Sequence, residues 1–162
     1  MRPLKIDPTK LDPEVKWRTS VSLFLNYIKA FHYTLKEKLD DKIAIEFHNY
    51  LVEYFWSEQS QAFIDLFALN PKSVIDAHSL KRTFAVILDI KYKPIIENEE
   101  EVIDEMEYVT CPFRNSLSPI FEGVCEACER IGQIFVKKLD ANNSHKVVIE
   151  NNICRHITKK KT

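Results

Sequence analysis

Apolar residues recur at helical spacing through the first half of this chain. From Val15 to Leu39 they are separated by steps of four and three, and a second stripe begins at Ile43, just after Asp40 and Asp41. Such stripes are typical of helices that bury one face. The first stripe comprises Trp17, Val21, Phe24, Ile28, Phe31 and Leu35, and the second comprises Ile43, Phe47, Tyr50, Tyr54, Gln61, Ile64 and Ala68. Because so few residues separate the stripes, the two helices should form an antiparallel hairpin or continue with a sharp bend.

The second half of the chain shows shorter and more mixed patterns. Alternation of apolar and polar residues there is typical of strands. Asn151 and Asn152 separate two such segments, and both can adopt the positive φ angles of a two-residue hairpin turn. The expected elements are a third helix at 73–88, strands at 91–97 and 102–109, a helix at 120–139, and strands at 146–150 and 153–157.

These elements together predict an α+β fold. An N-terminal helical hairpin and the third helix should pack on a small antiparallel sheet crossed by one helix, in the order ββαββ. The expected boundaries are an extended arm at 1–14, a helical region at 15–90, a cysteine-bearing α/β unit at 91–158 and a basic tail at 159–162. All of these should form one compact domain.

Composition narrows the classes of function. The 162 residues include only two glycines, which leaves no GxGxxG or P-loop motif for binding phosphate. The net charge of −1 gives no global attraction for nucleic acid, so no direct nucleic-acid binding is expected. No apolar run reaches membrane-spanning length and the first residues lack a signal-peptide core. We therefore expect no membrane partner and a cytoplasmic protein with reduced thiols.

All four cysteines lie in the last third of the chain. Cys111 should follow a strand, and Cys125 and Cys128 should share one face of a helix. Cys154 and His156 should share one face of the last strand. Thiolates and imidazole bind zinc, and thiolates also bind iron–sulfur clusters, so these five residues are candidate ligands for either cofactor. Buried, merely packed cysteines or a reactive thiol are the alternatives.

A catalytic role is one form of the reactive-thiol alternative. Cys111 precedes a predicted helix, which can lower a thiol pKa, and it could pair with His156. Such a pair also needs an orienting acid, for which Glu126 and Glu150 are available. The sequence does not place these groups together, so no catalytic residue is assigned.

The remaining polar residues are predicted to be structural. His32 and His48 lie on aromatic-rich helices, where a half-buried histidine is common, whereas His78 and His145 are expected at the surface. The stretch 97–107 holds seven carboxylates and is expected to form a solvated strand face.

Residues 102–157 carry a resemblance to known regulatory domains. The run Cys-Pro-Phe begins at Cys111, Cys125 follows 14 residues later, and Cys154 follows after 29 more within the sequence ICRHI. The pattern resembles the C-terminal domain of the winged-helix repressors of iron–sulfur assembly. It is also similar to the small-molecule-binding domains of the 4-vinyl reductase type, the methanogen output domains and the L-2-amino-thiazoline-4-carboxylic acid hydrolase-like proteins. Residues 151–152 replace the glycine usually found before the last cysteine.

This resemblance implies a sensor of metal, cluster or hydrophobic ligand. By position, Cys111, Cys125 and Cys154 would hold an iron–sulfur cluster, and Cys128 or His156 would supply a fourth ligand. No winged helix is recognisable at the N-terminus, so DNA binding does not follow from the resemblance.

Three functions are compatible with these observations. The first is a cytoplasmic sensor or regulatory domain that binds a metal or an iron–sulfur cluster, with a possible small-molecule ligand. The second is a small-molecule hydrolase of the amino-thiazoline hydrolase-like type. The third is a non-catalytic dimeric interaction module with buried thiols. The heptad-like spacing from Trp17 to Leu35 predicts a homodimer through the N-terminal helices.

Overall fold

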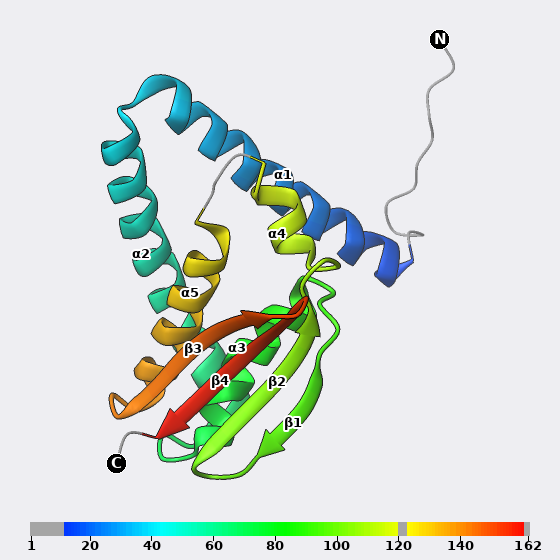
Figure 1. Cartoon of the computed structure of the whole chain (residues 1–162), viewed down its shortest axis with the longest axis vertical. Coiled ribbons are helices and arrows are strands. Elements are labelled where there is room, and N and C mark those ends of the chain that lie inside the picture. Colours follow the sequence, from blue (N-terminus) through cyan, green and yellow to red (C-terminus); the bar gives the residue numbers. More distant parts are fainter. Residues whose placement is uncertain (1–11, 120–122, 161–162) are drawn as a thin grey trace.

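The chain adopts the α+β fold that its sequence predicts. The computed structural model describes residues 12–119 and 123–160. Helices precede and flank a four-stranded antiparallel sheet (Figure 1). In chain order the elements are α1 Pro13–Lys38, α2 Asp41–Phe67, α3 Val74–Ile87, β1 Lys93–Glu97, β2 Glu101–Glu107, α4 Pro112–Leu117, α5 Val124–Leu139, β3 Asn143–Glu150 and β4 Ile153–Lys160.

Side-chain caps define where the first three helices begin. Asp12 and Asp40 cap α1 and α2 by accepting the backbone N–H two residues further on. Ser73 caps α3 by accepting a backbone N–H of the first turn. The helix α2 ends at Phe67, where Ala68 adopts a left-handed conformation with φ 49°. The breaks between these helices therefore have local causes in the sequence.

The sheet has the strand order β1-β2-β4-β3, with every neighbouring pair antiparallel. Residues 151–152 close the β3–β4 hairpin with φ angles of 50° and 66°, as the sequence predicts. The register pairs Cys154 with Ile149 and His156 with Val147. The predicted common face of these four residues is therefore confirmed.

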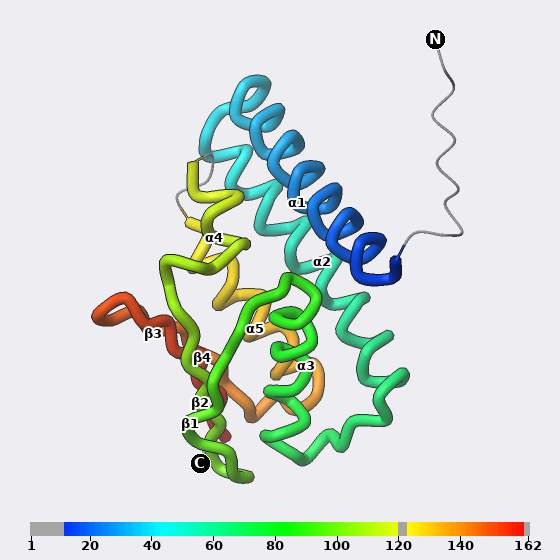
Figure 2. The backbone as a smooth tube through the Cα atoms, turned by 90° about the vertical axis from the view of Figure 1, so that its right-hand side faces the viewer, coloured from blue at the N-terminus to red at the C-terminus, as the bar shows by residue number. Residues whose placement is uncertain are grey.

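One face of the sheet is covered by α3 and α5, which pack against β2, β3 and β4. Figure 2 shows both helices on the same side of the strands. Buried residues alternate along β2 and β4, so one face of each strand is turned to the helices. In the helical layer, Trp56 makes edge-on contacts with Phe84 and Phe135 at centroid distances of 4.9 and 5.5 Å. The core therefore lies between the sheet and the helices.

Several features differ from the prediction, among them β3, which begins at Asn143, three residues before the predicted strand. Two helices, α4 and α5, connect β2 to β3 instead of one. The helix α1 begins at Pro13, inside the predicted extended arm, whose residues 1–11 lie outside the described part of the chain. The strand β4 continues through Lys159 and Lys160, two residues of the predicted basic tail. Their backbone pairs with β2 and β3, which explains the longer strand.

The helices α1 and α2 diverge from their joint like the arms of a V (Figure 1). Leu39 and Asp40 form the joint, after which α1 packs on α4 whereas α2 packs on α5. The predicted hairpin is thus an open one. Although α1 and α2 have 26 and 27 residues, no helix in the described ranges is both long and apolar enough to cross a membrane.

Candidate ligand-binding cavity and its histidine chain

A small cavity lies between α3, the first half of α5 and strands β2 to β4. Its volume is about 30 Å³, enough for roughly two water molecules. Its wall is mostly apolar, and it includes thiols, an amine and an imidazole. The thiols, the amine and the imidazole belong to Lys81, Cys111, Cys125, Cys128, Cys154 and His156, and the guanidinium of Arg114 also lines the cavity.

The four cysteines reach this cavity from three different elements. Cys111 precedes the first residue of α4, Cys125 and Cys128 lie one turn apart on α5, and Cys154 lies on β4. His156 follows on the same inward face of β4. The structure therefore brings together all five residues that the sequence analysis selects as candidate ligands.

The thiols surround the cavity without converging on one point. Within the described ranges, no three His, Cys, Asp or Glu side chains are arranged to hold a metal ion. Burial raises the pKa of Cys128 to about 12 and that of Cys154 to about 11. It also raises the pKa of Cys125. These three thiols are therefore protonated at neutral pH in the ligand-free protein, which does not favour them as nucleophiles.

Lys81 adds an amine to the same cavity. The residue is 3% exposed, and its Nζ has no hydrogen-bond partner among the described residues. Burial lowers its pKa to about 8, so the group is still mainly protonated at pH 7. A buried ammonium without a partner is unfavourable for folding. A buried amine of perturbed pKa beside several thiols marks the cavity as a candidate functional site.

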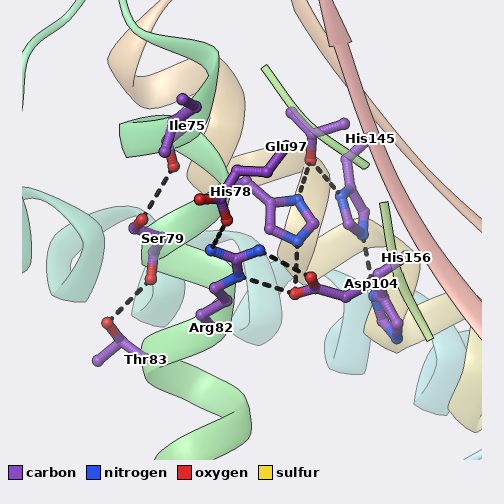
Figure 3. Close-up of polar contacts among 10 residues, drawn as sticks. Ile75, His78, Ser79, Arg82, Thr83, Glu97, Asp104, His145 and His156 are labelled. Atoms are coloured by element: carbon purple, nitrogen blue, oxygen red, sulfur yellow. Dashed lines mark hydrogen bonds and ion pairs between the residues drawn. The ribbon is translucent and has the colours of Figure 1, made fainter. Parts of the chain in front are cut away.

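A chain of hydrogen bonds leads from this cavity through the protein (Figure 3). Nδ1 of His156 lies 3.2 Å from Nε2 of His145, and Nδ1 of His145 lies 3.0 Å from Oγ1 of Thr158. The same hydroxyl lies 2.7 Å from Nδ1 of His78, and Nε2 of His78 lies 2.9 Å from Oδ2 of Asp104. All five side chains are buried. They join β2, β3 and β4 to α3.

Arg82 keeps Asp104 ionised within the protein. Its Nε and Nη2 donate to the two carboxylate oxygens at 2.9 and 2.8 Å, and its Nη1 donates to Glu97 at 2.6 Å. Burial opposes the ionisation of Asp104, but hydrogen bonds from Arg82 and His78 outweigh it and hold the pKa below its usual range. Because the Glu97 side chain is 45% exposed, the chain ends at solvent.

The ionised Asp104 gives the hydrogen-bond chain one direction. A carboxylate only accepts, so Nε2 of His78 carries a proton and Nδ1 accepts from the Thr158 hydroxyl. The hydroxyl oxygen accepts from Nδ1–H of His145, whose Nε2 accepts from Nδ1–H of His156. The neutral ring of His156 is thereby left with an unprotonated Nε2, on the edge turned away from His145.

Burial keeps all three histidines of this chain neutral. It lowers the pKa of His145 and His156 well below the usual range. It also lowers the pKa of His78, although the hydrogen bond to Asp104 acts in the opposite sense. The tautomers derived from the hydrogen-bond directions therefore describe the protein at neutral pH.

The sequence prediction is wrong for three of these residues. His78 and His145 are not at the surface but are 0% and 5% exposed, and Asp104 in the acidic strand is 0% exposed. One signal was present, because alternation places Asp104 on the same strand face as Val102 and Met106. A charge on an apolar face indicates a buried partner. For the histidines no comparable local signal exists.

No family model and no curated protein matches this chain. The resemblance carried by Cys111, Cys125 and Cys154 therefore stays a prediction.

Proposed function

We propose that this protein is a sensor domain that binds a thiophilic metal ion in the cysteine-lined cavity. The observation that carries the proposal is that four thiols and His156, with its Nε2 unprotonated, line one cavity. Thiolate sulfur and neutral imidazole nitrogen are the donors that zinc and other thiophilic ions prefer.

The orientation of His156 supports this proposal. Histidines that bind metal usually donate their other ring N–H to a partner, which selects the tautomer and holds the ring in place. Nδ1–H of His156 donates to His145, and the chain through Thr158 and His78 ends at the ionised Asp104. Any buried imidazole N–H needs a partner. This chain in addition selects the tautomer of His156 whose Nε2 can act as a ligand.

The charge of Lys81 supports the same proposal. An ion held by several thiolates forms a complex of net negative charge, and ligation requires the thiols to lose their protons. The ammonium of Lys81 can balance this charge together with the guanidinium of Arg114, which also lines the cavity. Binding would thus give the buried ammonium of Lys81 a negatively charged partner.

Ligation requires the cysteine side chains to turn toward one point, since they do not converge in the ligand-free arrangement. Cys111 precedes α4 and Cys125 lies in the first turn of α5, and these two helices pack on α1 and α2 respectively. Binding of an ion in the cavity would therefore change how α4 and α5 pack against α1 and α2. This connection is what makes a sensor the preferred role over a purely structural site.

A single ion suits the cavity better than an iron–sulfur cluster. The volume of about 30 Å³ would have to enlarge to enclose several iron and sulfide atoms. The resemblance favours a cluster on Cys111, Cys125 and Cys154, so cluster and zinc remain distinct forms of the proposal. Elemental analysis and the visible spectrum of protein purified without oxygen distinguish them, because a cluster is coloured and zinc is not.

The experiment is a titration of the reduced, metal-free protein with Zn²⁺ and with Co²⁺. We expect one ion per chain and a thiolate-to-cobalt absorption band. Cys128→Ser and Cys154→Ser should each weaken binding strongly, and Thr158→Val should weaken it by about 10- to 100-fold through the orientation of His156. The control is Val86→Ser, at an exposed position of α3.

Two results would overturn the proposal. One is no stoichiometric binding of either ion by folded, fully reduced protein. The other is unchanged affinity in both cysteine variants. Circular dichroism of each variant distinguishes loss of a ligand from loss of the fold.

A further inference from the structure

We propose that the surface of α1 and α2 that faces away from the core is an interface with a second copy of this chain. Each arm carries a stripe of exposed residues at helical spacing. The α1 stripe comprises Lys16, Leu23, Tyr27 and Lys38, and the α2 stripe comprises Ile43, Phe47, Tyr50, Tyr54, Glu58 and Asp65. The proposal does not depend on metal binding.

The α2 stripe is apolar although it faces away from the core. Its four apolar members belong to the stripe that the sequence predicts to be buried, yet Ile43, Phe47, Tyr50 and Tyr54 are 54%, 45%, 67% and 63% exposed. On the opposite side of the same helix, Val52 is buried. A helix that is apolar on two sides is typical of one that is covered on both.

An apolar groove connects the two stripes into one surface. Its volume is about 310 Å³, and Tyr27 from the α1 stripe lines it together with Phe31, Leu51 and Phe55. Phe47 from the α2 stripe contacts Phe31 with ring centroids 6.1 Å apart. The groove therefore reaches the α1 stripe at Tyr27, and it adjoins the α2 stripe through the contact of Phe31 with Phe47.

The charges of the two helices favour a second copy as the occupant. The helix α1 carries five basic and two acidic side chains, whereas α2 carries five acidic and one basic, histidines aside. In a two-fold dimer, α1 of each copy can lie against α2 of the other. Lys16 at the N-terminal end of the α1 stripe would then meet the carboxylates of Glu58 and Asp65, which lie two turns apart on α2.

The surface is also large enough for a stable dimer. The large apolar side chains of the stripes and the groove edge are 40% to 71% exposed. With about 150–250 Å² for each aromatic side chain, they supply apolar surface on the order of 800 Å² per copy. A standard protein interface buries about 800 Å² on each partner.

The first experiment is sedimentation equilibrium of the full-length chain at micromolar concentration. We expect twice the 19.0 kDa of one chain. Tyr54→Glu should give a monomer, whereas Leu66→Glu should leave the dimer intact. Leu66 is the matched control because it lies on the same helix, outside the stripe, and is 72% exposed. A monomeric parent protein, or equal effects of the two variants, would overturn the proposal.

A charge-reversal experiment tests the pairing of α1 with α2. Reversing Lys16 to glutamate should weaken dimerisation by about tenfold, and reversing Glu58 and Asp65 to lysine should do the same. Combining the three changes should restore most of the affinity. If the combined variant is weaker than either change alone, α1 does not face α2 of the partner. All three positions are exposed, so the fold itself should tolerate the changes.

Discussion

Lys81 lowers the stability of the fold that contains it. Its Nζ is buried without a hydrogen-bond partner among the described residues, and burial lowers its pKa from 10.5 to about 8. At pH 7, below both values, the full unfavourable contribution of the buried cation is present, about 3 kcal/mol. A residue that destabilises the empty protein is best explained by what it does in the occupied one.

Replacing Lys81 by methionine should therefore have opposite effects on folding and on binding. We expect Lys81→Met to raise the free energy of unfolding of the metal-free protein by up to about 3 kcal/mol at pH 7, and to weaken binding of Zn²⁺. Urea unfolding and metal titration measure the two effects. Lys137→Met, at an exposed position of α5, should change neither. A Lys81 variant that binds Zn²⁺ as tightly as the parent would contradict the assigned role.

The Thr158 hydroxyl is the link of the hydrogen-bond chain with two partners. It accepts from His145 and donates to His78, at 3.0 and 2.7 Å. Thr158→Val keeps the shape and removes both bonds, so we expect a loss of about 2–4 kcal/mol in the free energy of unfolding. Thr83→Val removes a hydroxyl that donates to the carbonyl of Ser79, within α3, and should cost less than about 1 kcal/mol. Equal losses would show that the chain contributes no special stability.

At the scale of elements, the chain depends on how closely α5 approaches β3. Gly132 lies on the inner side of α5, and a Cβ atom there would overlap the ring of His145. In an ordinary helix, Gly→Ala stabilises by about 1 kcal/mol. Here we expect Gly132→Ala to destabilise, because α5 or the His145 ring has to move.

A double-mutant cycle separates the gain in helix propensity from the cost of the overlap with the His145 ring. In a His145→Ala background the obstructing ring is absent, so Gly132→Ala should become neutral or stabilising. Chemical denaturation of the four proteins provides the comparison. Destabilisation of the same size in both backgrounds would mean that the close approach of helix and ring is not the cause.

The elements themselves follow from local signals in the sequence. The caps at Asp40 and Ser73 and the turn at 151–152 each act within a few residues, and the predicted turn is confirmed. The six residues of α4 give too short a pattern to be recognised. The inward face shared by Cys154 and His156 could be predicted because strand alternation is also local.

The buried hydrogen-bond chain could not be predicted in the same way. His78 bonds to residues 26 and 80 positions away in the sequence, and nothing near it indicates these partners. Lys81 enters the cavity only because α3 packs across the sheet beside α5. The cysteine cluster can be recognised in the sequence. The amine of Lys81 and the hydrogen-bonded histidines next to the cavity can be recognised only in the tertiary structure.

At the scale of the whole molecule, the protein folds with its histidines unprotonated. All five histidines of the chain are at most 8% exposed. Burial lowers the pKa of each, to about 4 for His48, whose ring centroid lies 4.4 Å from that of His32. The unfolded chain binds protons at these groups near pH 6.5, and the folded chain does so only at lower pH.

Stability of the metal-free protein should therefore fall as the pH drops below about 6.5. Each histidine contributes a slope of up to about 1.4 kcal/mol per pH unit between its unfolded and its folded pKa. Asp104 acts in the same direction only below about pH 4, because its pKa is lowered from the usual carboxyl range. Urea denaturation between pH 7 and pH 5 measures the contribution of the histidines to the free energy of unfolding. His48→Phe should reduce its slope with pH by the contribution of one histidine. If the free energy of unfolding stays constant over this range, the folded and the unfolded chain take up protons alike, and burial does not lower the pKa of the histidines.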